Sequence, residues 1–538
     1  MRPFAAFLLT GFLAASLASS AATDNTAQQE RGRAAYALYC ASCHQASGEG
    51  LKGVFPPLAG SDFLMEDLPR SIQIVLQGIS GELRVNGITY NGAMPPLPAL
   101  EDDKVAEVLT YVRSAWGNQS PAVTLADVAA VRAKIAVEEK NQTDPFAPLP
   151  KPPVGFQIRE VVKLPLHAVR LAGLPGKKWI FVLGSVGDIF RLEPATGNLV
   201  RLVAAAEYTD RTSAAGAIEA RGMTIDSKHR LYVVVNQRTV AQPFHLNQVT
   251  IFRSAPLDEK GMTITLKPWL KTSYPWGNSF YTHGVGHIAE GPDGMIYVSS
   301  GSRTDGGEEG TSPIIAKVRE TELTAGIWQL DPREENPVIK AYARGIRNPW
   351  TFAWNERGEL FSASNGPDAD VAEELDFVEA GKHYGFPYQF ADSEGKPYPH
   401  TPPLPEGVKP VHAIRNFGPA GGGSADHPMA TFDPHSSPTG MIFCGPEWPE
   451  SFRGKFLVGR FGAMTGARES GFDVLALTLK RNPAGIYEAH TEVFLAPVAR
   501  PIDQLQMGTK LYLLEYTRPT EYLTRRPMNP GRIVELSW

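Results

Sequence analysis

Apolar positions follow two different periods in the two parts of this chain. In the first part they recur at helical spacing, as Val105, Val108 and Val112 do in a predicted helix over residues 101–116. After residue 145 helical periodicity nearly disappears, and short segments alternate apolar and polar residues as strands do. The chain is therefore expected to fold as a small all-α domain followed by a larger all-β domain.

The β part repeats one hairpin pattern: a short strand, a turn rich in Asp, Asn or Gly, and a second alternating strand. Its six copies begin at His167, Arg221, Gly286, Trp350, Gly440 and Ile502. The even spacing of the copies from Arg221 to Trp350, with room for four strands each, predicts a six-bladed β-propeller over residues 156–538. A β-sandwich is the alternative, and the even spacing disfavours it.

Two further features concern the edges of this β domain. The longer interval before Gly440 predicts a large insertion at about residues 388–435. The first strand, "FQIREVVKL", and the last, "GRIVELSW", are expected to pair with each other. Such a pairing would close the ring of blades.

Residues 1–22 have the pattern of a secretory signal peptide: a basic start at Arg2, an apolar run from Phe4 to Leu17 and small residues at the end. An uncleaved membrane anchor is the alternative, although the run is short and rich in alanine. No later segment has eighteen consecutive apolar residues. We therefore expect a periplasmic protein without a stable membrane span.

Residues 119–155 are expected to join the two domains. The segment begins with one more predicted helix, for which Thr124 and Asp127 form a candidate N-terminal capping pair. It ends in the proline-rich sequence "DPFAPLPKPPVG", which is typical of a stiff extended linker. The small domain then covers residues 27–118.

Charge and cysteine content narrow the range of functions. The chain has 52 Lys+Arg against 57 Asp+Glu, a formal net charge of −5, and no basic run, so no nucleic-acid partner is expected. An exported chain with only three cysteines forms at most one disulfide. The fold must therefore depend on its hydrophobic core.

Two of the three cysteines stand in "YCASCH", which runs from Tyr39 to His44. Cys-x-x-Cys-His is the attachment signal of a c-type haem: the thiols of Cys40 and Cys43 add to the vinyl groups, and His44 binds the iron. The alternatives are a redox Cys-x-x-Cys or half of a zinc site, and a second Cys/His pair for zinc is absent from the sequence. Cys444 is expected to be a buried apolar residue.

The haem iron also needs a sixth ligand, and a thioether would raise the reduction potential and suit electron transfer. The small domain contains Met65 and Met94. We predict Met94, because "YNGAMPPLPAL" gives it an extended backbone and small neighbours, whereas Met65 lies in a predicted helix. Residues 28–117 resemble class I cytochrome c domains, which implies a one-electron carrier with His44 and Met94 as axial ligands.

Three motifs in the β domain contain charged and polar residues that the strand-and-turn pattern of a propeller blade does not require. "FYTHGVGHIAEGPDG" contains His283 and His287, which are alternatively a metal pair or packed surface histidines. "ARGIRNPW" contains Arg347 and Asn348, and "SNGPDADVAEELDFVEAGKHYGFP" joins a Gly-Pro turn to acidic residues. Together the motifs resemble those of the soluble quinoprotein glucose and aldose (sorbosone) dehydrogenases, six-bladed propellers that carry pyrroloquinoline quinone (PQQ).

This resemblance implies roles for individual residues. It makes His283 the general base, a role that suits a neutral imidazole near pH 7. His287 falls on a position that is usually basic. Arg347 and Asn348 would flank the reactive quinone carbonyl.

The resemblance also implies how the cofactors are held. The backbone oxygens of Gly366 and Pro367 would bind Ca²⁺, which prefers hard oxygen ligands. The positive charges of Arg347, Arg460 and Arg500 would meet the carboxylates of PQQ. Without the family pattern, each of these arginines is an ordinary solvated charge.

The sequence departs from the family pattern after the strand that follows the base. Many relatives have Gly-Asp there, whereas this chain has Gly301 followed by Ser302. A carboxylate that would orient His283 is therefore missing. This departure affects the expected substrate choice and rate more than the fold.

The combined prediction is a periplasmic quinohaemoprotein dehydrogenase. Its small-molecule substrate is expected to be a sugar (aldose) or a related alcohol, which it would oxidise with PQQ. The tethered c-type haem would receive the electrons one at a time and pass them to a respiratory acceptor. One alternative is a haem-d-type nitrite reductase-like enzyme, which has eight blades. Others are a non-catalytic propeller with a haem relay or sensor, and a lactonase-like propeller, which leaves the haem unexplained.

Overall fold

The computed structural model describes residues 26–37, 39–52, 55–94, 97, 100–141, 146–210, 216, 218–239, 241, 243–277, 283–310, 315–391, 398–463, 470–518 and 529–538. The predicted signal peptide lies outside these residues. The chain divides into two compact units, Met1–Thr143 with Leu523–Pro527, and Asp144–Tyr522 with Met528–Trp538. The division falls within the predicted joining segment, residues 119–155.

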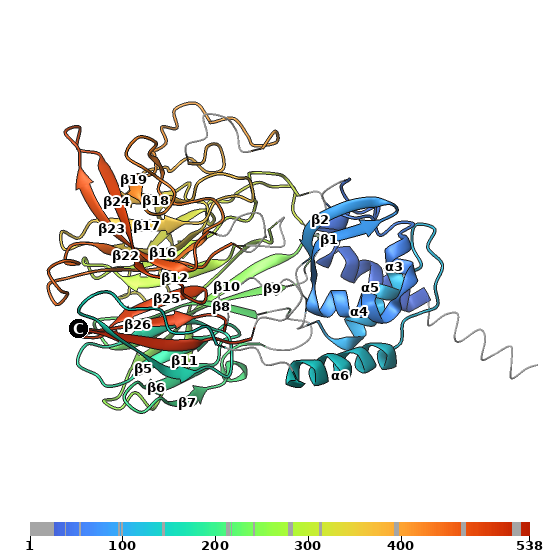
Figure 1. Ribbon diagram of the computed structural model, residues 1–538, viewed down its shortest axis with the longest axis horizontal. Coiled ribbons are helices and arrows are strands. Elements are labelled where there is room, and N and C mark those ends of the chain that lie inside the picture. Colours follow the sequence, from blue (N-terminus) through green and yellow to red (C-terminus); the bar gives the residue numbers. More distant parts are fainter. Residues whose placement is uncertain are drawn as a thin grey trace, which may run out of the picture. The chain divides into compact units, whose positions relative to one another are not determined.

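The first unit is mainly helical (Figure 1). After a helix within residues 26–37, its elements are α2 (Ala41–His44), α3 (Asp62–Glu66), α4 (Leu68–Gln77), β1 (Ile79–Val85), β2 (Ile88–Met94), α5 (Asp102–Val112) and α6 (Leu125–Asn141). Helices α4, α5 and α6 contact one another around a single core. The predicted capping pair of α6 is present, since Asp127 N donates to Thr124 Oγ1 at 3.1 Å and Thr124 N donates to Asp127 Oδ2 at 2.9 Å.

The antiparallel hairpin β1–β2 is a feature that the helical periodicity does not predict. Its two-residue turn is formed by Asn86 and Gly87, both with positive φ (50° and 77°), and this pair of residue types favours such turns. Met94 is the last residue of β2 and pairs with Ile79. The hairpin therefore fixes where the predicted iron ligand lies.

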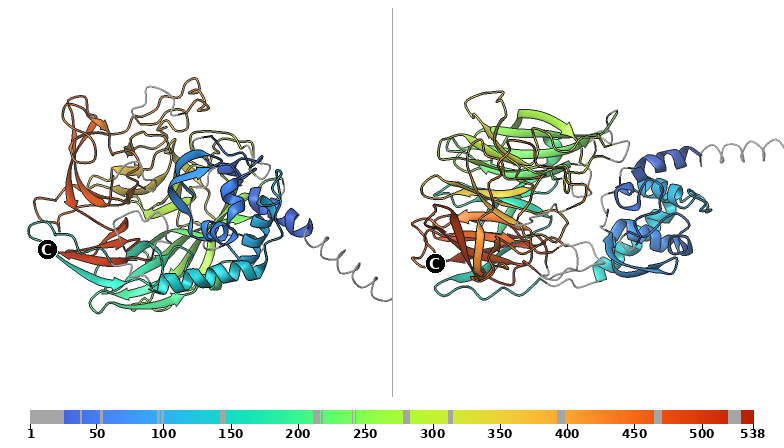
Figure 2. Two further views of the ribbon diagram at one scale, coloured as in Figure 1. Left: turned by 45° about the vertical axis from the view of Figure 1, so that its right-hand side comes forward. Right: turned by 90° about the horizontal axis from the view of Figure 1, so that it is seen from above.

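The described residues of the second unit form six sheets (Figures 1 and 2). Blade one is β4 (Ala168–Gly173), β5 (Ile180–Gly184), β6 (Ile189–Glu193) and β7 (Asn198–Val203); blade two is β8 (Ile218–Ile225), β9 (Arg230–Thr239), β10 (Leu246–Pro256) and β11 (Leu266–Pro275); blade three is β12 (Val285–Glu290), β13 (Ile296–Ser300), β14 (Gly326–Leu330) and β15 (Lys340–Arg344). A short 3-10 helix, Ala205–Glu207, follows blade one.

Blades four to six complete the set. Blade four is β16 (Pro349–Trp354), β17 (Leu360–Ser364) and β18 (Glu374–Val378); blade five is β21 (Pro438–Phe443), β22 (Phe456–Arg460), β23 (Asp473–Arg481) and β24 (Tyr487–Leu495); blade six is β25 (Pro501–Gln506), β26 (Lys510–Glu515), β27 (Arg532–Ser537) and β3 (Gln157–Lys163). Strands β19 (Arg415–Pro419) and β20 (Met429–Ala430) lie in the predicted insertion and extend blade five beside β24.

The inner strands of the blades form a closed cycle. Each of β4, β8, β12, β16, β21 and β25 contacts the next, and β25 contacts β4. Among the described residues, a separate hydrophobic core fills each space between adjacent blades. The six-bladed propeller is confirmed, and so is the closure, because β27 pairs antiparallel with β3.

The fully buried side chain of Arg170, on β4, connects four inner strands. It donates to the carbonyl oxygens of Arg221 and Trp350, both at 2.8 Å, and lies 3.3 Å from Asp503 Oδ1. The other carboxylate oxygen of Asp503 accepts from Leu171 N at 2.7 Å. A guanidinium without water around it is costly unless its donors are satisfied, and here the strand carbonyls satisfy them.

Candidate haem pocket and active site

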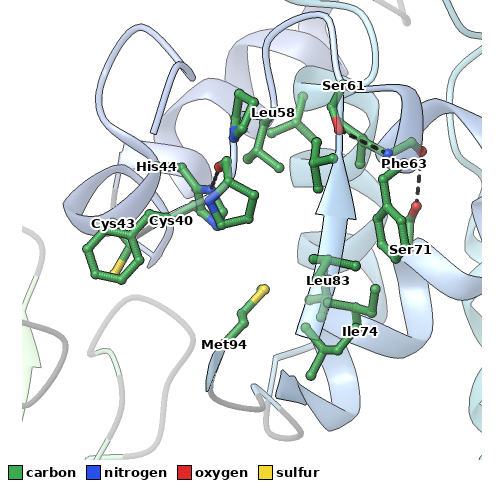
Figure 3. Close-up of a pocket in the computed structure, with 18 of the residues that line it drawn as sticks. Cys40, Cys43, His44, Leu58, Ser61, Phe63, Ser71, Ile74, Leu83 and Met94 are labelled. Carbon is green, nitrogen blue, oxygen red and sulfur yellow. Dashed lines mark hydrogen bonds between the residues drawn. The ribbon is translucent and has the colours of Figure 1, made fainter. Parts of the chain in front are cut away.

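A largely apolar cavity in the first unit contains the whole predicted haem-binding set (Figure 3). Cys40, Cys43, His44 and Met94 line it. The apolar lining comes from Phe55, Pro56, Leu58, Ile74, Val75, Leu83, Tyr90, Val108, Leu109 and Val112, among others. The empty space between its walls, including the part open to solvent, is about 1110 Å³.

The geometry of His44 suits an iron ligand. Its Nδ1 lies 2.9 Å from the carbonyl oxygen of Pro56, which can only accept, so Nδ1 carries the hydrogen and Nε2 carries the lone pair. Burial lowers the pKa of His44, which keeps the ring neutral. The Met94 side chain points into the same cavity from the end of β2 (Figure 3), whereas Met65 lies half-buried on α3.

Cys40 and Cys43, three residues apart, form no disulfide in the structure. Burial, together with the neighbouring Cys43, raises the pKa of the Cys40 thiol to about 12. Thiols at the edge of an apolar cavity, with a histidine and a methionine lining it, fit a covalently attached haem. The redox Cys-x-x-Cys alternative explains neither the cavity nor Met94.

In the propeller, the structure brings His283 and Asn348 together around Gly301. His283 lies just before β12, Gly301 directly follows β13, and Asn348 directly precedes β16. A Cβ atom at position 301 would lie 2.3 Å from the His283 Cβ and 2.9 Å from Asn348 Oδ1. Only glycine therefore allows the predicted base and the predicted quinone-binding amide to approach this closely.

His283 is held in the neutral state. Burial lowers its pKa well below the usual value, and the positive charges of Arg347 and Arg221 lower it further. Its Nδ1 lies 3.2 Å from Ser302 Oγ. A neutral imidazole can accept a proton, so the arrangement suits the predicted general base.

Arg347 lies beside these residues and is buried. Its Nε donates to the Asp305 carbonyl at 2.9 Å and its Nη2 to Asp305 Oδ1 at 2.6 Å. Its Nη1 donates to the carbonyls of Asn365, at 3.1 Å, and Gly366. The predicted quinone-binding arginine and the predicted calcium-binding turn are therefore in direct contact.

A buried carboxylate lies beside the backbone of the Gly366–Pro367 turn. Glu373, which sequence reasoning missed, is buried, and its Oε2 has no hydrogen-bond partner within the part of the chain that the structure describes. Burial raises the pKa of this carboxyl group to about 8, while a hydrogen bond from the Gly366 backbone opposes the rise. Carbonyl and carboxylate oxygens are the ligands that Ca²⁺ prefers.

The two remaining predicted PQQ contacts lie on blades five and six. Arg460, at the end of β22, binds both oxygens of Asp473 at 2.8 and 2.6 Å and Asp433 at 2.7 Å, so two carboxylates already balance its charge. Arg500 is fully buried and donates to the carbonyls of Gly462 and Ala463 at 3.3 and 3.2 Å. Their roles toward PQQ stay predictions.

His287 has a packing role in this structure. Its half-buried ring meets the edge of Phe352 on β16, with centroids 4.6 Å apart. Burial and the charge of Arg170 lower its pKa well below the usual value. Among the described residues no group of three or more His, Cys, Asp or Glu side chains is arranged as a metal site, so the alternative of a histidine metal pair gains no support.

Comparison with known proteins now decides the family. A family model described as Glucose / Sorbosone dehydrogenase matches residues 226–468, and one described as Cytochrome c matches residues 29–116. The chain contains a cytochrome c domain followed by a glucose/sorbosone dehydrogenase domain. The glucose/sorbosone dehydrogenase domain supports an oxidoreductase, and the cytochrome c domain implies a c-type haem.

The cytochrome c domain has relatives among known proteins. It is 38% identical over 121 residues to cytochrome c-552 of Thermus thermophilus, covering 22% of this chain and 73% of that protein. It is 33% identical over 131 residues to the cytochrome c subunit of a quinone alcohol dehydrogenase from Gluconacetobacter polyoxogenes, covering 22% of this chain and 25% of that subunit.

Solved structures resemble the propeller of this chain at low sequence identity. One is the PQQ-bound aldose sugar dehydrogenase from Streptomyces coelicolor, at 20% identity and a TM-score of 0.48, covering 72% of this chain and 99% of that one. Another is the apo-form of the soluble aldose sugar dehydrogenase from Escherichia coli, at 15% identity and a TM-score of 0.47, covering 71% and 99%. The eight-bladed nitrite reductase alternative is wrong, because the ring has six blades.

Proposed function

We propose that this protein is a PQQ-dependent dehydrogenase that oxidises an aldose or a related alcohol and delivers the electrons to its own c-type haem. The observation that carries the proposal is the meeting of His283 and Asn348 at Gly301, with Arg347 alongside. It combines a neutral base with hydrogen-bond donors of the kind that a quinone carbonyl requires.

The residues that would hold the cofactors are those described above. Arg347 and Asn348 would meet the quinone carbonyl, Arg460 and Arg500 the carboxylates, and the carbonyls of Gly366 and Pro367 the Ca²⁺ ion. When bound, PQQ supplies the two-electron acceptor and the haem a one-electron acceptor.

The chain itself contributes proton removal and orientation. His283 Nε2 would take the substrate hydroxyl proton, and the buried surroundings keep the ring unprotonated until it does so. Arg347 is held by Asp305 and by two backbone carbonyls, so its positive charge stays fixed while negative charge develops nearby.

The match to the glucose/sorbosone dehydrogenase model and the names of similar proteins support a sugar substrate. The signal-like residues 1–22 support a periplasmic location, from which electrons would pass to a respiratory acceptor. Within the described residues, no helix is long and apolar enough to cross a membrane.

The experiment is to add aldoses and simple alcohols to protein reconstituted with PQQ and Ca²⁺, without an external mediator, and to follow the reduced haem band. The band should appear only with PQQ present, and His283→Gln should slow its appearance by about 10²- to 10⁴-fold. His412→Gln, which changes an exposed histidine, is the control. Unchanged haem reduction in His283→Gln would contradict the proposal.

A further inference from the structure

The hydroxyl group of Ser302 lies between a histidine nitrogen and a backbone carbonyl. Ser302 Oγ is 3.2 Å from His283 Nδ1 and donates to the carbonyl oxygen of Thr304 at 2.8 Å. Ser302 and Thr304 are both fully buried. The serine occupies the position where the sequence lacks the carboxylate expected to orient the base.

The chemistry of these groups fixes the direction of each hydrogen bond. A serine hydroxyl has one proton, and a carbonyl oxygen can only accept. Because the proton goes to Thr304, the hydroxyl oxygen accepts from His283, so Nδ1 carries the ring hydrogen. In the neutral ring, Nε2 then holds the lone pair.

The backbone around Ser302 prevents the serine from turning away. Ser302 N donates to the Arg347 carbonyl at 2.7 Å. The next residue, Arg303, is fully buried and donates to the carbonyls of Pro275 and Trp276 at 3.1 and 2.7 Å. Thr304 N donates to Glu320 at 3.0 Å. The turn is therefore bonded to blades two, three and four.

We propose that Ser302 is a positioning residue that fixes His283 as the Nδ1–H tautomer through an uncharged hydrogen bond, and so presents Nε2 as the base. The role of that base rests on the proposed dehydrogenase function, whereas the tautomer itself does not. A serine in this position orients the ring without adding negative charge.

The missing charge has a consequence for pH dependence. The charged groups that act on His283 are Arg347, just before β16, and Arg221, on β8, and both disfavour a protonated ring. A hydrogen bond with the Ser302 backbone raises the pKa of His283 only in part, and the uncharged serine adds no negative charge to offset the two arginines further. The base should therefore stay active at acidic pH, and Ser302→Asp should move the acidic limb of the kcat/KM profile to higher pH.

The tautomer can be read directly from the ring ¹⁵N shifts of histidine-labelled full-length protein, with His283→Gln assigning the signals. We expect Nδ1–H in the unaltered protein and a mixture of tautomers in Ser302→Ala. Ser300→Ala is the matched control, because Ser300 is a buried serine on β13 whose hydroxyl donates to the Leu323 carbonyl at 2.6 Å. That variant should leave the His283 signals unchanged.

Kinetics then test the positioning role. Ser302→Ala should lower kcat by about 10- to 100-fold with little change in KM, a smaller loss than removal of His283 itself. Ser302→Thr should restore kcat, because it returns the hydroxyl group. An Nε2–H tautomer in the unaltered protein would overturn the inference. So would an unshifted pH profile in folded Ser302→Asp. If no variant reduces haem with PQQ, the dehydrogenase function fails, and the ¹⁵N shifts still decide the tautomer.

Discussion

Arg347 Nη2 lies 2.6 Å from Asp305 Oδ1, and the other carboxylate oxygen of Asp305 accepts the phenolic hydrogen of Tyr398. Tyr398 belongs to the predicted insertion at residues 388–435, and its neighbour Thr401 donates to the Gly306 carbonyl at 3.0 Å. The insertion is thus hydrogen-bonded to the loop that holds Arg347, the predicted quinone-binding arginine.

The hydrogen bonds from Asp305 to Arg347 and Tyr398 predict a larger loss of stability in an Asp305 variant than in a Tyr398 variant. Asp305→Ala leaves a buried guanidinium without its carboxylate and should lower the free energy of unfolding by about 3 kcal/mol, with weaker PQQ binding. Tyr398→Phe removes one hydrogen bond and should cost about 1 kcal/mol. Denaturant unfolding and PQQ titration measure both effects. Equal PQQ affinity in Asp305→Ala and the unaltered protein would show that Asp305 does not position Arg347.

The sixth iron ligand can be tested with a matched pair of variants. Met94→Leu should keep the haem attached through Cys40 and Cys43 but lower its reduction potential, because a thioether ligand raises it. Met65→Leu changes the other methionine of the domain and should leave the potential unchanged. Redox titration with visible spectroscopy distinguishes them. A potential that shifts in Met65→Leu alone would reverse the assignment.

The buried pair of Arg170 and Asp503 predicts a non-additive effect. Asp503→Leu should lower the free energy of unfolding by about 3–5 kcal/mol, because it leaves Arg170 as an uncompensated buried charge. The double variant Arg170→Met, Asp503→Leu should be more stable than Asp503→Leu alone. Urea unfolding of both single variants and the double variant measures the coupling. Simple additivity would argue against a direct interaction.

Asp376 predicts a pH dependence of stability. It is fully buried on β18, and burial raises its pKa to about 8. The folded state keeps this proton up to about pH 8, whereas the unfolded state releases it at the ordinary carboxyl pKa. The contribution of protonated Asp376 to the free energy of unfolding is therefore complete below the ordinary carboxyl pKa. This contribution is lost as pH rises from there toward 8.

The variant Asp376→Asn removes this titration. Between pH 5 and pH 8, its stability should fall with pH less steeply than that of the unaltered protein, by up to about 1.4 kcal/mol per pH unit. Urea unfolding at a series of pH values gives the two slopes. Identical slopes would mean that Asp376 is ionised in the folded protein.

Local sequence signals predict much of this fold because each blade begins with its own hairpin. The hairpin at Arg221 is β8–β9, and that at Gly286 is β12–β13. The hairpin β1–β2 was missed although Asn86 and Gly87 form a strong turn signal, since its strands alternate weakly between apolar and polar residues.

Side-chain networks at the sites were less predictable. Arg170 and Asp503 are separated by 333 residues, and no local pattern indicates such a pair. The family resemblance gave His283, Arg347 and Asn348, but not the serine hydroxyl that orients the base. Hydrogen-bond direction depends on where the Thr304 carbonyl points, which is a property of the folded turn.

The pairing of β3 with β27 has a consequence for how the propeller is made. During synthesis β3 emerges before every other propeller strand and β27 after all of them, and the register joins Ile533 to Val162. No incomplete nascent chain therefore has a finished sixth blade. The ring can close only after β27, the last strand to be translated, has paired with β3.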